Sequence, residues 1–159
     1  MFKNLKKLLG GVNPEFANTT SGFSTINRQT KVEIATCALF IELAKSDGEF
    51  SDEEREVIIT QMKNLFNLEK KYVDDLILLA EEKVKQSVSI YEFTGIINKS
   101  FTQEEKIELL EKLWKLIFTD EKLSAYEDHM IKRIGATMNI EHKQIINSKL
   151  WVKQQLGLD

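Results

Sequence analysis

Two short acidic stretches carry the residue types in this chain that are best suited to chemistry. The first reads DGEFSDEE over residues 47–54, and the second reads DEKLSAYED over residues 120–128. In each stretch an Asp is followed by a Ser four positions later and by a Glu three positions after that. Carboxylate oxygens beside the free carbonyl groups at the end of a helix suit a hard cation such as Ca²⁺ or Mg²⁺. The candidate metal ligands are Asp47, Glu49, Glu54, Asp120 and Glu127, with Asp128 as an additional candidate.

A structural explanation of the same residues competes with the metal site. The Ser and Glu of each stretch match a capping box, and the apolar residues before the Ser, Phe50 and Leu123, match a hydrophobic staple. The box does not account for Asp47 and Asp120, because each lies near the carboxyl end of the preceding predicted helix, where the dipole disfavours an anion. A metal site and a pair of capped helices with a solvated acidic rim therefore both stay open.

The two stretches are not equally suited to a metal. Neither is an EF-hand, whose loop is longer and ends in a bidentate Glu. The second stretch has no glycine and carries Lys122 where the first has Glu49. If only one stretch binds a cation, we expect it to be the first.

Predicted helices surround both stretches. Residues 28–45 are apolar on nearly all sides, which is typical of a helix in the middle of a bundle. Helical spacing of apolar residues predicts two more helices over about 69–85 and 141–153. Four capping-box patterns predict further helix starts, at Ser51, Ser89, Thr102 and Ser124. The predicted fold class is all-α, a single bundle of about seven helices preceded by a short N-terminal amphipathic helix.

The order of these elements repeats within the chain. Aligning Asp47 with Asp120 also aligns the two Ser and Glu pairs and, after a gap of one residue, residues 66–69 with 138–141. The repeat halves span about 28–86 and 103–153, with one extra helix between them. We expect one domain over residues 28–159 with an internal pseudo-twofold repeat. If its two halves pack about a pseudo-twofold axis, both acidic loops could face the same side.

Residues 1–27 are predicted to form a separate region, a short basic amphipathic helix followed by a flexible linker. Apolar residues at helical spacing lie opposite lysines, and the candidate contact residues are Phe2, Lys3, Leu5, Lys6, Lys7 and Leu9. Such a helix could lie on an anionic membrane surface, pack on its own domain or dock on a protein partner. At about ten residues it would be marginal as a free helix, so disorder is a further alternative.

Composition excludes several classes of function. The net charge of −3 gives no electrostatic case for nucleic acid. No apolar run approaches the roughly 20 residues of a membrane span, and no secretory signal is evident, so we expect a cytoplasmic protein. Catalytic Ser-His-Asp sets and glycine-rich phosphate loops are also absent from the sequence, which predicts neither an enzyme nor an organic cofactor.

Three further residues are expected in the core. Cys37 falls in the most apolar predicted helix and is interpreted as an inert buried thiol. Trp114 and Trp151 occupy apolar positions of their predicted helices and are interpreted in the same way.

The DGEFSDEE stretch on a helix-rich chain, with its echo at residues 120–127, resembles the tellurite-resistance protein B (TerB) family. The resemblance covers roughly residues 28–153. It implies a compact helical bundle with internal pseudo-symmetry, no established enzymatic activity and a link to stress response. It also implies a divalent-metal site at Asp47, Glu49, Glu54, Asp120 and Glu127. We therefore expect a non-enzymatic stress-response module that binds a cation and acts through a protein partner. The alternative is a metal-independent adaptor that binds a protein, or a membrane surface through residues 1–10.

Overall fold

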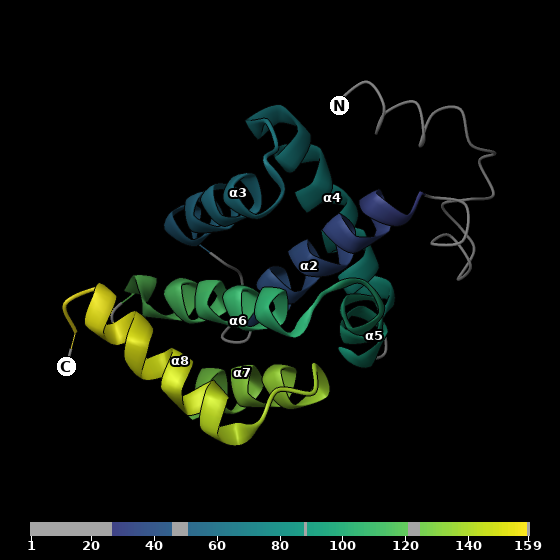
Figure 1. Cartoon of the computed structure of the whole chain (residues 1–159). Coiled ribbons are helices and arrows are strands. Elements are labelled where there is room, and N and C mark those ends of the chain that lie inside the picture. The colour runs from purple at the N-terminus through teal and green to yellow at the C-terminus, as the bar shows by residue number, and fades with distance from the viewer. Residues whose placement is uncertain (1–26, 46–50, 88, 121–124, 159) are drawn as a thin grey trace.

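The computed structural model describes residues 27–45, 51–87, 89–120 and 125–158. These ranges contain seven α-helices and one short 3₁₀ turn, and no strand occurs within them. The elements, shown in Figure 1, are α2 (Arg28–Ala44), α3 (Asp52–Phe66), α4 (Lys70–Gln86), α5 (Tyr91–Ser100), α6 (Gln103–Ile117), η4 (Phe118–Asp120), α7 (Ala125–Thr137) and α8 (His142–Gln155). The all-α prediction is confirmed, and all seven helices predicted after residue 27 are present.

The helix α2 occupies the centre of the bundle. Thirteen of its 17 residues are buried, including Phe40 and Cys37 at 0 % exposure. It packs against α3, α4, α5, α6 and α7, and Figure 1 shows it crossing the middle of the molecule. This confirms the prediction of a central helix, because a helix that is apolar on most sides must be covered on most sides.

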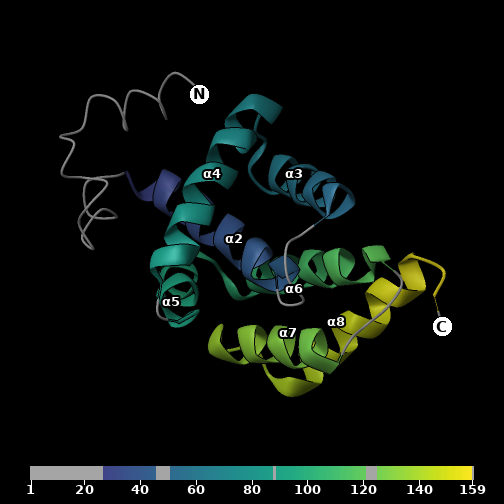
Figure 2. The ribbon, with the colours of Figure 1, turned by 180° about the vertical axis from the view of Figure 1, so that it is seen from behind.

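Two groups of three helices have the same internal packing. In the first group α2 contacts α3 and α4, which also contact each other, and in the second α6 contacts α7 and α8 in the same way. The helix α5 stands between the groups and packs on α2 and α7. Figure 2 shows the second group, α6, α7 and α8, gathered on one side of α2.

The turns at the second junction of each group also match. Asn67 and Asn139 have left-handed backbones, with φ of 55° and 62°. The next residue in each turn reaches back five positions, since the amide of Leu68 donates to the carbonyl of Lys63 and that of Ile140 to Gly135. Both turns are therefore helix ends of the Schellman type, in which Asn tolerates the left-handed conformation.

Two of the predicted capping boxes form within the described ranges, and a third does not. Ser51–Glu54 and Thr102–Glu105 each make both reciprocal hydrogen bonds. At Ser89 the prediction is wrong, because the cap residue is Ile90, with a helical backbone and a buried side chain. The hydroxyl of Ser89 instead accepts from the amide of Tyr91, two residues on. Ser124 lies outside the described residues.

Of the two tryptophans predicted to be buried, the structure confirms one. Trp114 is fully buried and stacks on Phe118 with ring centroids 5.8 Å apart. Trp151 is 45 % exposed, and its neighbour Leu150 is exposed as well. The core side of α8 is formed instead by Ile145, Ser148 and Val152, so Leu150 and Trp151 lie outside the buried core.

Candidate functional site

The structure describes only part of the predicted metal site. Asp47 and Glu49 lie outside the described residues. Asp120 ends the turn η4, and its side chain is likewise outside the description. Glu54, Glu127 and Asp128 are the candidate ligands whose surroundings can be examined.

Glu54 lies in the first turn of α3 and is held by the capping box. Its Oε1 accepts a hydrogen bond from the amide of Ser51 at 2.9 Å, while its own amide donates to the Ser51 hydroxyl at 3.1 Å. The residue is only 7 % exposed. A carboxylate has two oxygens and about four acceptor positions, so the cap bond leaves it with capacity to accept further.

Glu127 occupies the corresponding place in the second group. It lies in the first turn of α7 and is 3 % exposed, so both predicted carboxylates of this pair are buried. Burying a carboxylate is costly unless charge or hydrogen bonds compensate it. The two glutamates are thus both buried at the third position of their helices.

Asp128 belongs to a different cluster. It accepts a hydrogen bond from Lys149 of α8 at 3.0 Å and forms an ion pair with Lys132 of its own helix. Burial tends to raise the pKa of this carboxyl, but the hydrogen bonds from Lys132 and Lys149 outweigh burial and hold the pKa below its ordinary value of 3.8. The ammonium groups of Lys132 and Lys149 both contact the Asp128 carboxylate, which therefore links α7 to α8. We do not retain Asp128 as a metal ligand.

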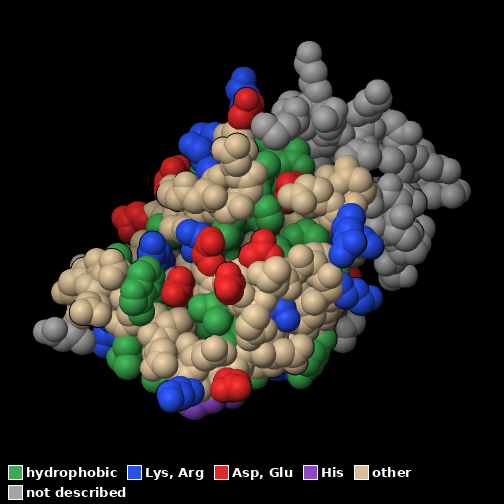
Figure 3. Space-filling view, in the orientation of Figure 1, with side chains coloured by type: hydrophobic (Ala, Val, Ile, Leu, Met, Phe, Trp, Pro, Cys, Tyr) green, Lys and Arg blue, Asp and Glu red, His purple; other side chains and the backbone are tan. Residues whose placement is uncertain are grey.

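The two loops meet the described fold close to each other. The turn η4, which leads into residues 121–124, packs against α3, the helix that follows residues 46–50. Figure 1 shows η4 and the start of α3 at the same end of the molecule. The space-filling view in Figure 3 shows acidic side chains gathered over α6, the helix that carries η4 at its end.

Within the described ranges, no group of three or more His, Cys, Asp and Glu side chains has the spacing to hold a metal ion. Glu54 and Glu127 would therefore need the loop carboxylates Asp47, Glu49 and Asp120 to complete a ligand set.

The remaining chemically reactive side chain has no role in such a site. Cys37 is fully buried in α2, and burial raises the pKa of its thiol far above the ordinary range. This agrees with its interpretation as an inert thiol, since the thiolate is the reactive form.

The candidate contact residues at positions 2–9 lie outside the described residues. Among the helices that the structure describes, none has the length and apolar character to cross a membrane.

Sequence reasoning missed one cavity, of about 440 Å³, whose lining includes Arg28, Leu65, Phe101 and Glu108. These residues come from α2, α3, the α5–α6 junction and α6. No local spacing pattern in the sequence could have indicated it, because each segment contributes only two or three positions.

Comparison with known proteins gives one match. The family model described as tellurite resistance protein TerB matches residues 33–150. No curated protein and no solved structure matches the chain.

Proposed function

Since the chain belongs to the TerB family, whose model matches most of its length, we propose that it is a non-enzymatic stress-response module that binds a divalent cation between its two acidic loops. In this proposal the module works in the cytoplasm and acts through contacts with a protein partner. Bound cation would tie the start of α3 to the start of α7, and so link the two three-helix groups.

One observation carries the proposal. The turn η4 packs on α3, so the residue that opens the second acidic stretch, Asp120, lies in a turn that contacts the helix after the first. Loops that belong to different repeat halves can share an ion only if such a contact brings their ends together. The buried glutamates Glu54 and Glu127 add support, because both lie in the first turn of the helix that follows each loop.

The chemistry of the donor set fits Ca²⁺ or Mg²⁺. The proposed ligands Asp47, Glu49, Glu54, Asp120 and Glu127 offer only carboxylate oxygens, which hard cations prefer. The ion would supply charge neutralisation and a cross-link. The residues of the chain would position it, with Glu54 held in place by the Ser51 amide.

A matched pair of variants separates the metal from the helix cap. Glu54 and Glu105 make the same capping box, with cap-amide bonds of 2.9 and 2.8 Å, but the residues before Thr102 form no acidic stretch. Gln can still accept the hydrogen bond from the cap amide, so Glu54→Gln and Glu105→Gln remove only the favourable negative charge at a helix N-terminus. Each should lower the stability of metal-stripped protein by roughly 0.3–1 kcal/mol.

Only the variant at the loop should also change the response to metal. We expect millimolar Ca²⁺ or Mg²⁺ to raise the melting temperature of wild type and of Glu105→Gln, because an ion that binds only the native state stabilises it. The rise should be lost in Glu54→Gln combined with Asp47→Asn. An equal rise in all these proteins would contradict the proposal.

A second function is favoured by the Thr102–Glu105 box itself. It forms without an acidic loop, so capping alone can account for Glu54. The chain would then be a metal-independent adaptor that binds a protein or a membrane surface. Binding of a partner that depends on residues 1–10 and is unaffected by a chelator would favour this alternative.

A further inference from the structure

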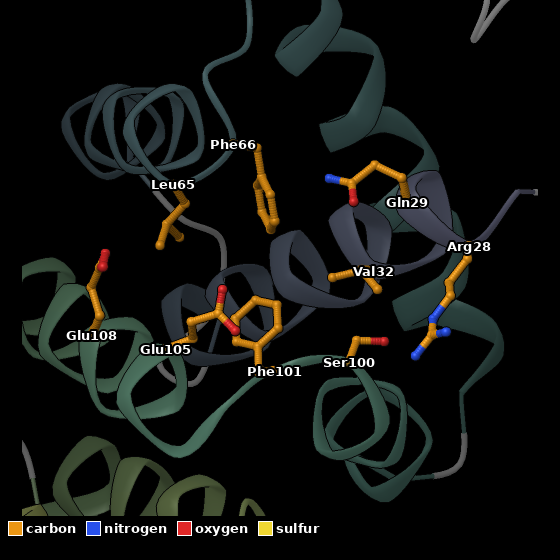
Figure 4. Close-up of a pocket in the computed structure, with 9 residues that line it drawn as sticks. All are labelled: Arg28, Gln29, Val32, Leu65, Phe66, Ser100, Phe101, Glu105 and Glu108. Atoms are coloured by element: carbon orange, nitrogen blue, oxygen red, sulfur yellow. The ribbon is translucent and has the colours of Figure 1, made fainter.

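The cavity beside α2 has an apolar floor. Val32 is buried at its base, and half-buried Leu65, Phe66 and Phe101 surround it. The rings of Phe66 and Phe101 lie 6.3 Å apart at an angle of 59°. Figure 4 shows both rings turned toward the middle of the hollow. A volume of about 440 Å³ lies within the range of sites that bind ligands or side chains, roughly 300–1,000 Å³.

The rim of the cavity is charged unevenly. Glu105 and Glu108 line it along α6, and both are exposed. Arg28 stands on the other side of the view in Figure 4, and its guanidinium donates to the carbonyl of Lys99 at 3.1 Å. The α6 side therefore offers two carboxylates to a cationic ligand, next to an apolar floor.

We propose that residues 2–9 of this chain dock in this cavity as a short basic amphipathic helix. The apolar residues Phe2, Leu5 and Leu9 would contact the floor, and Lys6 and Lys7 would lie toward Glu105 and Glu108. The segment matches the site in both polarity and charge. Eight helical residues span about 12 Å, so a few large side chains at helical spacing suit one cavity of this size.

The position of the cavity also favours this occupant. Arg28 and Gln29, which line it, are the first residues of α2, so the chain preceding α2 arrives at the rim. Residues 10–26 connect the segment to that point. A flexible linker of about 17 residues has an end-to-end distance of roughly 20–25 Å. Such a tether gives an effective concentration in the millimolar range, which promotes even a weak intramolecular contact.

The test is paramagnetic relaxation enhancement in the full chain, with a spin label on Asn4→Cys. Cys37 is fully buried and should stay unlabelled. We expect the amide signals of Phe66, Ser100 and Phe101 to lose at least twice as much intensity as those of Lys143 and Gln155 on α8. The same label on a chain carrying Leu5→Glu and Leu9→Glu is the control for random contacts of a tethered segment. Both substitutions precede the described helices and so leave their core residues unchanged. In this control the signal loss at the cavity should fall by half or more.

The charge match has its own test. Glu108→Lys should weaken the broadening at Phe66 and Phe101, and adding Lys7→Glu to it should restore part of the loss. Glu82→Lys, an equal charge change at an exposed position of α4 that does not line the cavity, should have no effect.

Three outcomes would overturn the proposal. One is equal broadening with and without Leu5→Glu and Leu9→Glu. Another is broadening between chains in a mixture of spin-labelled and isotope-labelled protein, which would assign the cavity to a second copy. The third is an unaffected cavity together with binding of residues 2–9 to vesicles containing phosphatidylserine, which would assign the segment to a membrane surface. None of these outcomes depends on the metal site.

Discussion

Glu127 and Asp128 are neighbours in the sequence, and their carboxylates lie in different surroundings. Glu127 is 3 % exposed at the start of α7. Asp128 is turned toward Lys132 and Lys149 and fixes α7 to α8. Two adjacent acidic residues thus serve different parts of the fold, and only Glu127 stays a candidate ligand.

The Asp128 cluster predicts a dependence of stability on pH. Its folded-state pKa lies below the ordinary 3.8, so it stabilises the fold above that pH and loses this contribution as pH falls through the lower folded value. The difference in free energy of unfolding between wild type and Asp128→Asn should therefore be largest near neutral pH, with wild type the more stable. Urea unfolding between pH 7 and pH 2 should show the difference shrinking below about pH 4. Parallel loss of stability in the two proteins would contradict this assignment.

Single residues also mark where sequence reasoning fails. The spacing that placed Trp114 in the core applied equally to Trp151, yet Trp151 is exposed because α8 turns Ile145 and Val152 inward. The pattern at Ser89 matched a capping box as well as those at Ser51 and Thr102. There the buried side chain of Ile90 fixed a different helix start. Tertiary packing decided both cases, and a local pattern does not contain it.

Pairs of helices and their turns show a closer agreement with the sequence. Asn67 and Asn139 were aligned from sequence alone, and both have the left-handed backbone that ends a helix. Glu69 and Glu141 then precede the next helix with extended backbones. Apolar periodicity and turn residues are local signals, so they could predict the order of helices, whereas the packing partners of α5 could not be read from them.

The equivalent turns predict equivalent mutational costs. Asn67→Ala and Asn139→Ala should each lower the free energy of unfolding by about 1 kcal/mol, because a left-handed conformation is unfavourable for Ala. The corresponding glycine variants should be neutral or slightly stabilising, since Gly adopts positive φ readily. Chemical unfolding of the four variants measures this. A cost at only one of the two positions would show that the turns are not equivalent.

The contact between α7 and α8 depends on a glycine. A Cβ on Gly135 would lie 2.8 Å from Cδ1 and 2.9 Å from Cγ1 of Ile145, which is buried. Gly135→Ala should therefore destabilise the fold by roughly 1–3 kcal/mol through overpacking. Gly95→Ala in α5 is the matched control, because a Cβ there meets nothing within 4 Å. It should stabilise by up to about 1 kcal/mol through helix propensity. Thermal unfolding with the opposite order of stabilities would disprove the close contact.

At the scale of the whole molecule, the fold brings together segments that lie far apart in the sequence. The turn η4 contacts α3, and the cavity that Leu65 and Phe66 of α3 help to line collects residues from position 28 to position 108. The all-α class and the positions of the two acidic stretches between helices could be predicted from residue spacing. The cavity could not, because its lining depends on how four segments cross.

The central claim is that the two acidic loops form one divalent-cation site in a TerB-family module. The most direct measurement is a titration of metal-stripped, isotope-labelled protein with Ca²⁺ and Mg²⁺, followed through backbone amide shifts. We expect saturable shifts that cluster in residues 47–54 and 120–127 and that appear in both loops at the same ion concentration. Shifts confined to one loop would contradict a shared site. No shift at millimolar ion would contradict a metal site altogether, and Glu54 and Glu127 would then serve only the starts of α3 and α7.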